Sequence, residues 1–196
     1  FNNEEQGEKV ATRLYQAALG RKLEDIYADR VESKKRYREL TGNRIRIIDN
    51  ANIYRRDVER ICELEQPALI VFDQIDKIKG FDSEREDLRL GSIYQWAREL
   101  AKTYAPVIGV CQADGSGEGK KWLTMENVAN AKTSKQAEAD WILGIGKTHE
   151  PGLEYVRYLH LSKNKLQGDE DSVPELRHGR RDVVIFPEVA RYKDCD

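Results

Sequence analysis

The sequence has no long apolar run, little cysteine and almost no net charge, and each absence excludes a class of protein. No run approaches the ~20 apolar residues that a membrane-spanning helix requires, so we expect no membrane association. The 196 residues include 33 basic and 35 acidic side chains, for a net charge of −2. No overall positive field therefore indicates nucleic-acid binding, although local basic clusters remain able to provide it.

The three cysteines, Cys62, Cys111 and Cys195, are far apart and form no Cys-x-x-Cys pair. The three histidines are equally scattered, so the sequence has no ligand spacing typical of a structural zinc site. Unpaired cysteines are typical of a reducing compartment, and we expect a cytoplasmic protein.

Helix and strand patterns alternate along the chain. Apolar residues recur at intervals of three and four in the helical patterns, whereas short apolar runs predict strands. We expect helices in 8–19, 23–40, 53–64 and 84–104, and strands in 44–49, 68–73, 106–112, 139–145, 155–161 and 183–186. Such alternation is typical of an α/β fold with a largely parallel, twisted sheet and helices on both faces. We expect a single domain over residues 1–196.

The most informative strand pattern is 68–73, which reads ALIVFD and ends abruptly in an acid. An apolar run without polar alternation predicts a strand buried on both faces. Asp73 would then lie at the carboxyl end of the strand, where open α/β sheets bind their ligands. In P-loop ATPases an Asp at this point, the Walker B residue, holds Mg²⁺ against the nucleotide phosphates. Asp73 is therefore the candidate residue for binding Mg²⁺ and nucleotide.

The companion motif of such ATPases is missing from the sequence. No Gly-x-x-x-x-Gly-Lys-Ser/Thr loop, the segment that cradles phosphates, occurs in these residues. The chain begins with Phe1 rather than Met, and we expect it to be a fragment of a longer protein that carries the loop upstream. If no such loop precedes Phe1, the chain is not an ATPase.

Four segments in order resemble the DnaB-type hexameric replicative helicases, possibly their phage-type members. They are the opening segment with Glu4, the VFDQ run ending the strand at Asp73, the VIGVCQ run ending at Gln112, and ADWI at 139–142. The resemblance implies a RecA-like P-loop NTPase core and an ATP-dependent DNA helicase that uses ATP and Mg²⁺. It also implies a homo-hexamer acting on single-stranded DNA in a bacterial or phage-infected cell, with a primase or a helicase loader as partner.

The resemblance also implies roles for three residues. Glu4 would orient and activate the water that attacks the γ-phosphate. Asp73 would hold Mg²⁺, and Gln112 would contact the γ-phosphate and report its presence to the DNA-binding loops, since an amide both donates and accepts hydrogen bonds. Plainer interpretations remain open for Glu4, which suits the positive end of the following helix, and for Gln112, which could satisfy local backbone groups.

The basic residues depart from the family pattern. The family's Arg-Glu-Ser-Gly is replaced by Asn-Ala-Lys-Thr before the ADWI strand, and the resemblance implies DNA contacts there. In the family's Lys-x-Arg-x-Gly turn, Lys takes the place of Arg, so that charge is kept but the bidentate fork is lost. The candidates for DNA contact are Lys120, Lys121, Lys132 and Lys135, and those for action on a neighbouring subunit's ATP site are Lys163 and Lys165.

Two alternatives to the helicase remain open. A RecA-type recombinase or clock-type ATPase would share the fold and the acid at Asp73 but place its DNA loops differently. A nucleotide-independent scaffold or binding module would have no phosphate loop at all. The residues preceding Phe1 distinguish these possibilities.

Overall fold

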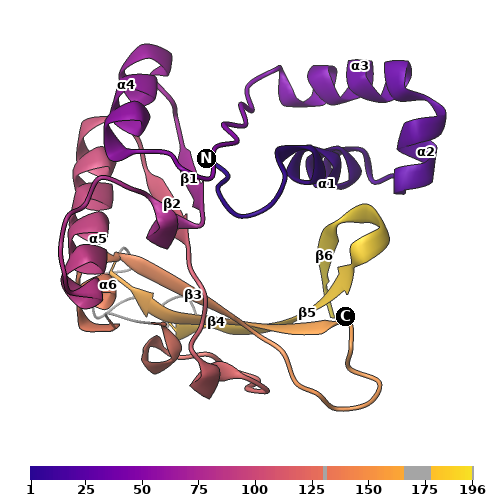
Figure 1. Ribbon diagram of the computed structural model, residues 1–196. Coiled ribbons are helices and arrows are strands. Elements are labelled where there is room, and N and C mark those ends of the chain that lie inside the picture. Colours follow the sequence, from indigo (N-terminus) through magenta and orange to yellow (C-terminus); the bar gives the residue numbers. More distant parts are fainter. Residues whose placement is uncertain (130–131, 166–177, 196) are drawn as a thin grey trace.

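The computed structural model describes residues 1–129, 132–165 and 178–195 (Figure 1). The helices are α1 (Gly7–Leu19), α2 (Leu23–Ala28), α3 (Arg30–Thr41), α4 (Arg55–Glu65), α5 (Glu86–Thr103) and α6 (Lys132–Glu138). The strands are β1 (Ile70–Asp73), β2 (Val107–Val110), β3 (Trp141–Gly146), β4 (Val156–Asn164), β5 (Arg180–Phe186) and β6 (Arg191–Asp194). Single 3₁₀ turns in these residues are η1 (Ile75–Lys77), η2 (Gly115–Gly117), η3 (Met125–Asn127) and η4 (Pro187–Val189).

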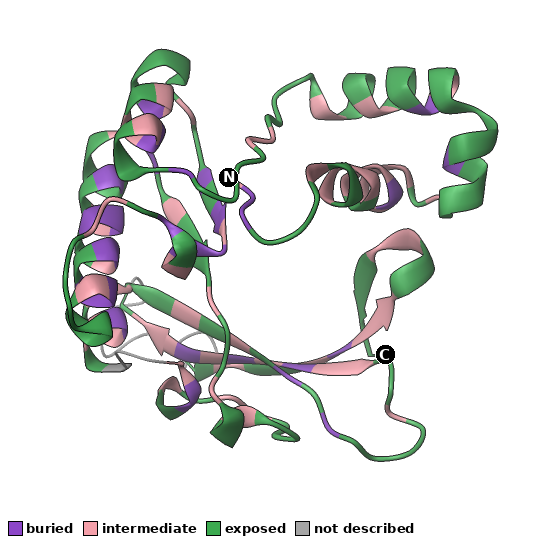
Figure 2. Cartoon of the chain, in the orientation of Figure 1, coloured by how far each residue is buried: buried purple, intermediate pink, exposed green. Residues whose placement is uncertain are grey.

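The main core lies between two helices and the parallel strands. Helix α5 buries an apolar stripe at helical spacing, with Leu90, Ile93, Trp96, Ala97 and Leu100 facing inward. The stripe packs with α4 against β1, whose Phe72 is fully buried and lies 5.6 Å from the Trp96 ring. Figure 2 shows this concentration of buried residues in α4, α5 and β1. The helical periodicity of 84–104 correctly predicted this helix.

The parallel strands form one sheet that extends beyond the two regular strands. Strand β1 pairs with β2 from Ile70↔Val107 to Asp73↔Val110. On the other side of β1, Asn2 forms parallel bridges to both Asp73 and Asp49. Segment 1–3 therefore lies beside β1, segment 48–50 lies beside segment 1–3, and both run in the same direction as β1 and β2. The carboxyl ends of all four consequently meet at one edge of the sheet. The strand predicted at 44–49 is not formed, apart from the single bridge at Asp49.

The second sheet corrects the prediction of a largely parallel fold. Its order is β3-β4-β5-β6 and every pairing is antiparallel. No helix is present between β3 and β4 in the fully described link 147–155. A parallel pair requires a long crossover connection, whereas a short loop can only reverse the chain, so these strands must run antiparallel. The sequence patterns identified β3, β4 and β5 but not β6, and they did not give the direction of any of these strands.

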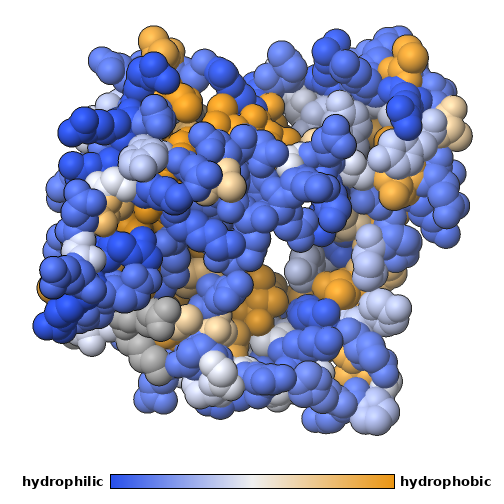
Figure 3. All heavy atoms as spheres, viewed as in Figure 1, coloured by the Kyte–Doolittle hydropathy of each residue, from blue (hydrophilic) through white to orange (hydrophobic). Residues whose placement is uncertain are grey.

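Helices on both faces of the parallel sheet are also not observed among the described residues. The face opposite α4 and α5 leaves four apolar side chains at least 40% exposed: Leu69, Val71, Ile108 and Val110. Figure 3 shows apolar atoms reaching the surface among the polar side chains. This face has no covering helix within the described part of the chain.

The first three helices form a separate arm beside the sheets (Figure 1). Residues 23–40 are two helices rather than the single one predicted, because Asp29 ends α2 and caps α3 by accepting from the Glu32 backbone N–H at 3.1 Å. Gln16 of α1 donates to the Glu188 carbonyl at 2.8 Å, and Arg191 donates to the Ala17 carbonyl at 2.7 Å. The arm is thus attached to the β5–β6 hairpin. No helix of the described residues is long and apolar enough to cross a membrane.

Candidate functional site

The carboxyl edge of the parallel sheet brings Glu4 and Asp73 to neighbouring strand ends. The backbone N–H of Asn3 donates to the Asp73 carbonyl at 2.8 Å, so the strand ends are in register. Glu4 follows Asn3 directly, and Asp73 is the last residue of β1. The parallel pairing of these two segments therefore puts two carboxylate residues at one edge of the sheet. The sequence predicted a parallel sheet but not which segments pair in it.

Gln112 lies near the end of the third neighbouring strand. Strand β2 ends at Val110, opposite Asp73, and Gln112 is exposed two residues further on. Its backbone carbonyl accepts from the Ala129 N–H at 3.2 Å, which ties it to the segment before α6. The side chain itself is left facing solvent. The three residues thus follow three adjacent parallel strands.

Two asparagines at this edge were not identified from the sequence. Asn3 is 6% exposed, and its Oδ1 accepts from the backbone N–H of Gln74, immediately after Asp73. Its Nδ2 has no hydrogen-bond partner within the described residues. Asn2 donates through Nδ2 to Asp49 at 2.7 Å, and Asp49 accepts from the Gly7 N–H that begins α1. Polar residues at the carboxyl ends of predicted strands were the available signal for Asn3 and Asp49.

The neighbouring acid Glu5 has a different environment from Glu4. Glu5 pairs with Arg13 of α1 at 2.8 Å. Glu4 instead pairs with Lys77 of η1, with Nζ 3.4 Å from Oε1. Only Glu4 is therefore connected to the turn that follows Asp73, whereas Glu5 is directed to the arm.

Lys163 and Lys165 lie at the carboxyl end of α6. Lys163 Nζ donates to the Gln136 carbonyl, and Lys165 Nζ donates to the Ala137 carbonyl at 3.2 Å. Cations are favoured there, because the last helical carbonyls carry partial negative charge. Burial, together with the nearby Lys165 charge, lowers the pKa of Lys163. In this structure both lysines contact their own chain.

An acidic and basic cluster surrounds these lysines. Arg98 of α5 contacts Glu138 at 2.8 Å and Asp140 at 2.9 Å. The hydrogen bond from Arg98 lowers the pKa of Asp140, and the nearby Lys165 and Lys163 charges lower it further. The cluster joins α5, the end of α6 and the start of β3, so it fixes the position of α6.

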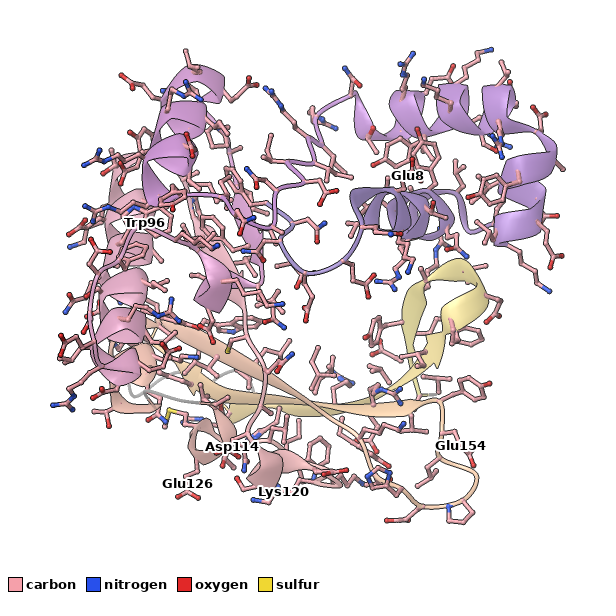
Figure 4. All side chains as sticks on the ribbon, viewed as in Figure 1. Glu8, Trp96, Asp114, Lys120, Glu126 and Glu154 are labelled. Carbon is pink, nitrogen blue, oxygen red and sulfur yellow. The ribbon has the colours of Figure 1, made fainter. Side chains whose placement is uncertain are left out.

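The four candidate DNA-binding lysines have different environments. Lys120 is exposed on the loop beside η2 (Figure 4). Lys121 lies 4.6 Å from the Tyr158 ring centre and 3.6 Å from Asp182. The side chain of Lys132 lies outside the described residues.

Lys135 is only 2% exposed and pairs with Asp76 at 2.5 Å, so this structure does not present it to DNA. Lys135 lies on the inner side of helix α6. The sequence of this helix has no clear apolar stripe, so it gave no sign of which side faces inward.

The fit of this edge to Mg²⁺ and nucleotide depends on few groups. The described residues contain no cluster of three or more His, Cys, Asp or Glu side chains able to hold a metal ion. Magnesium commonly uses one or two carboxylates together with substrate phosphates and water, so a single Asp73 carboxylate is compatible with it. The unpartnered Nδ2 of Asn3 adds a buried donor on the residue whose backbone pairs with Asp73. The donor set therefore fits a metal–phosphate ligand better than a metal alone.

Comparison with solved structures identifies the fold. A structure described as an ATPase domain is similar with a TM-score of 0.75 and 14% sequence identity, over 100% of this chain and 73% of that chain. A DnaB-like replicative helicase, described with its interactions with primase, gives a TM-score of 0.75 at 12% identity, and this chain spans 51% of its length. No family model matches the sequence. No curated protein matches it. The chain thus has the fold of a DnaB-type helicase ATPase domain, as the resemblance implied.

Proposed function

We propose that this chain is the motor domain of an ATP-dependent replicative DNA helicase that hydrolyses NTP at subunit interfaces and moves along single-stranded DNA. The observation that carries the proposal is the placement of Glu4, Asp73 and Gln112 after three adjacent parallel strands. Ligands of open α/β sheets bind at this edge. An acid for the metal, a second acid for water and an amide for the phosphate are the groups that phosphoryl transfer needs.

Each residue has a role that suits its chemistry. Bound Mg²⁺ neutralises negative charge on the phosphate oxygens. Asp73 holds the metal through its carboxylate. Glu4 orients a water molecule and accepts its proton as the water attacks phosphorus. Gln112 donates to a phosphate oxygen and, through its backbone, is joined to the segment that leads to α6.

In this proposal, the phosphate loop would come from a strand–loop–helix segment, which these residues do not include. Among the described residues β2 pairs only with β1, and β3 pairs only with β4. Both strands therefore keep one unpaired edge, and they carry four apolar side chains that are at least 42% exposed: Ile108 and Val110 in β2, and Trp141 and Ile145 in β3. A strand that pairs here with its helix would cover this apolar surface, and its loop would reach the carboxyl edge.

The remaining groups supply the other parts of the proposed motor. Lys120 and Lys121, with Lys132, would contact DNA phosphates, so binding should tolerate any sequence and weaken with salt. Lys163 and Lys165 would give up their hydrogen bonds to the end of α6 and act on a neighbouring subunit's ATP site. This role requires a homo-oligomer, which we propose to be a hexamer. A primase or a helicase loader is the expected partner.

The deciding experiment measures ATP turnover by the complete gene product, translated from its natural start codon. We expect Mg²⁺-dependent turnover that increases when single-stranded oligothymidylate is added. A complete product with neither ATP binding nor turnover would reject the motor and support the second candidate, a nucleotide-independent scaffold. That candidate is favoured by the lack of a phosphate-loop motif in these residues. Turnover with a recombinase-type strand exchange activity would instead indicate a RecA-type enzyme.

A further inference from the structure

The 3₁₀ turn η1 connects two parts of the proposed motor through consecutive residues. It begins two residues after Asp73, and Ile75 anchors it in the core at 1% exposure. Asp76 extends from this turn to α6, while Lys77 extends to Glu4. A shift of this one turn would therefore change the surroundings of both α6 and Glu4.

In the contact with α6, Lys135 is buried and both carboxylate oxygens of Asp76 accept hydrogen bonds. Asp76 Oδ2 accepts from Lys135 Nζ at 2.5 Å, and Oδ1 accepts from the Tyr94 hydroxyl at 3.0 Å. The Lys135 ammonium lies 5.3 Å from the Tyr94 ring centre, where a cation is attracted to the aromatic face. A buried ammonium without its carboxylate is costly, so α6 and η1 are expected to move together.

The contact with Glu4 is of a different kind. Lys77 and Glu4 are 3.4 Å apart, with side chains 42% and 34% exposed. Such exposed pairs contribute little to stability and break readily. While the pair exists, the Lys77 ammonium holds the Glu4 carboxylate at the turn η1. The pair can therefore restrain Glu4 without locking it.

We propose that η1 couples nucleic-acid binding to hydrolysis: Lys77 restrains Glu4 in the absence of DNA, and displacement of α6 by DNA moves Asp76 and releases Glu4. This inference rests on the proposed function, because it requires Glu4 to activate water. Lys132, one of the residues proposed to contact DNA, is the first residue of α6. The tight contact at Asp76 transmits the displacement, and the weak contact at Lys77 gives way.

The test uses ATP turnover by the complete gene product with and without oligothymidylate. Asp76→Asn combined with Lys135→Met removes the buried Lys135 charge together with its partner's charge, and it leaves an amide to accept from Tyr94. We expect this pair to leave DNA-free turnover unchanged and to reduce the stimulation by DNA about fivefold or more, as for ordinary coupling between sites. Lys77→Met should raise DNA-free turnover toward the stimulated level. The triple variant should behave like Lys77→Met alone.

The controls separate coupling from folding and from failure of the motor. Lys102→Met, on the exposed end of α5, should change neither rate. Thermal unfolding and DNA affinity by fluorescence anisotropy show whether each variant is folded and binds DNA.

Full stimulation in the Asp76–Lys135 variant, or unchanged or lower DNA-free turnover in Lys77→Met, would overturn the coupling while leaving the motor intact. If the Asp76–Lys135 double variant fails to fold, it is replaced by Lys135→Arg, which keeps the positive charge beside Asp76 and should retain the stimulation by DNA. Loss of stimulation in folded Lys135→Arg also counts against the coupling. A wild-type product without turnover would reject both proposals.

Discussion

The backbone N–H of Asn3 donates to the carbonyl of Asp73 at 2.8 Å, across two strands that are remote from each other in the sequence. This hydrogen bond aligns the strand that leads to Glu4 with the strand that ends at Asp73. Two acids from distant segments thereby reach the same edge of the parallel sheet. The first prediction depends on this alignment.

Glu4→Gln should reduce ATP turnover by the complete gene product about a hundredfold or more, because loss of a general base typically costs that much. ATP binding, measured with a fluorescent ATP analogue, should stay close to wild type. Glu5→Gln is the matched control, since Glu5 pairs with Arg13 and not with the turn after Asp73. Weakened binding with residual turnover in Glu4→Gln would contradict the assignment.

Lys165→Ala tests action between subunits. When Lys165→Ala subunits are mixed with Glu4→Gln subunits, each nearly inactive alone, we expect turnover to reappear, because an interface can then combine Glu4 from one subunit with Lys165 from its neighbour. No gain in turnover on mixing would show that Lys165 acts only within its own chain, at the end of α6. Lys102→Ala provides the exposed-lysine control for the mixing experiment.

We expect the ion pair of Asp140 to make the free energy of unfolding smaller at acid pH. The hydrogen bond from Arg98 lowers the pKa of Asp140 in the folded state. Its stabilising contribution is therefore complete above the ordinary aspartate pKa of about 3.9 and is lost as pH falls through the lower folded value. Urea unfolding at pH 7 and pH 3 should show a smaller difference for Asp140→Asn than for wild type. The effect should be small, since the carboxylate is 47% exposed. An equal reduction in the exposed control Asp82→Asn would argue against a specific contribution.

Gly146 should tolerate no side chain. A Cβ built there overlaps the Lys121 carbonyl oxygen and lies 2.6 Å from that of Lys120. Gly146→Ala would force the loop carrying both lysines away from β3, and we expect a loss of about 1–3 kcal/mol in the free energy of unfolding. DNA affinity should fall as well. Gly115→Ala is the matched control, because nothing lies within 4 Å of its added Cβ. Unchanged stability in Gly146→Ala would mean that the loop is not held on the strand.

Local patterns predicted those parts of the candidate site that depend on one segment. The apolar run before Asp73 specifies a buried strand, and the acid that ends it must lie at the strand's carboxyl end. Gln112 follows from the next apolar run in the same way. No local pattern identifies Asp76 and Lys77 as partners of residues elsewhere, because η1 is a single turn without periodicity. The predicted roles of Glu4, Asp73 and Gln112 remain to be tested.

The sequence by itself determined the position of elements with a clear local pattern: α5 has its apolar stripe and β1 its unbroken apolar run. The prediction that β1 is buried on both faces was wrong, because Val71 is 40% exposed on the face that no described helix covers. Only the tertiary structure decided that β3 to β6 run antiparallel, and that Lys135 lies inside while Lys163 and Lys165 contact the end of α6. Strand direction depends on how connections cross the sheet. A lysine's environment depends on which distant carboxylate or carbonyl group folding brings within reach.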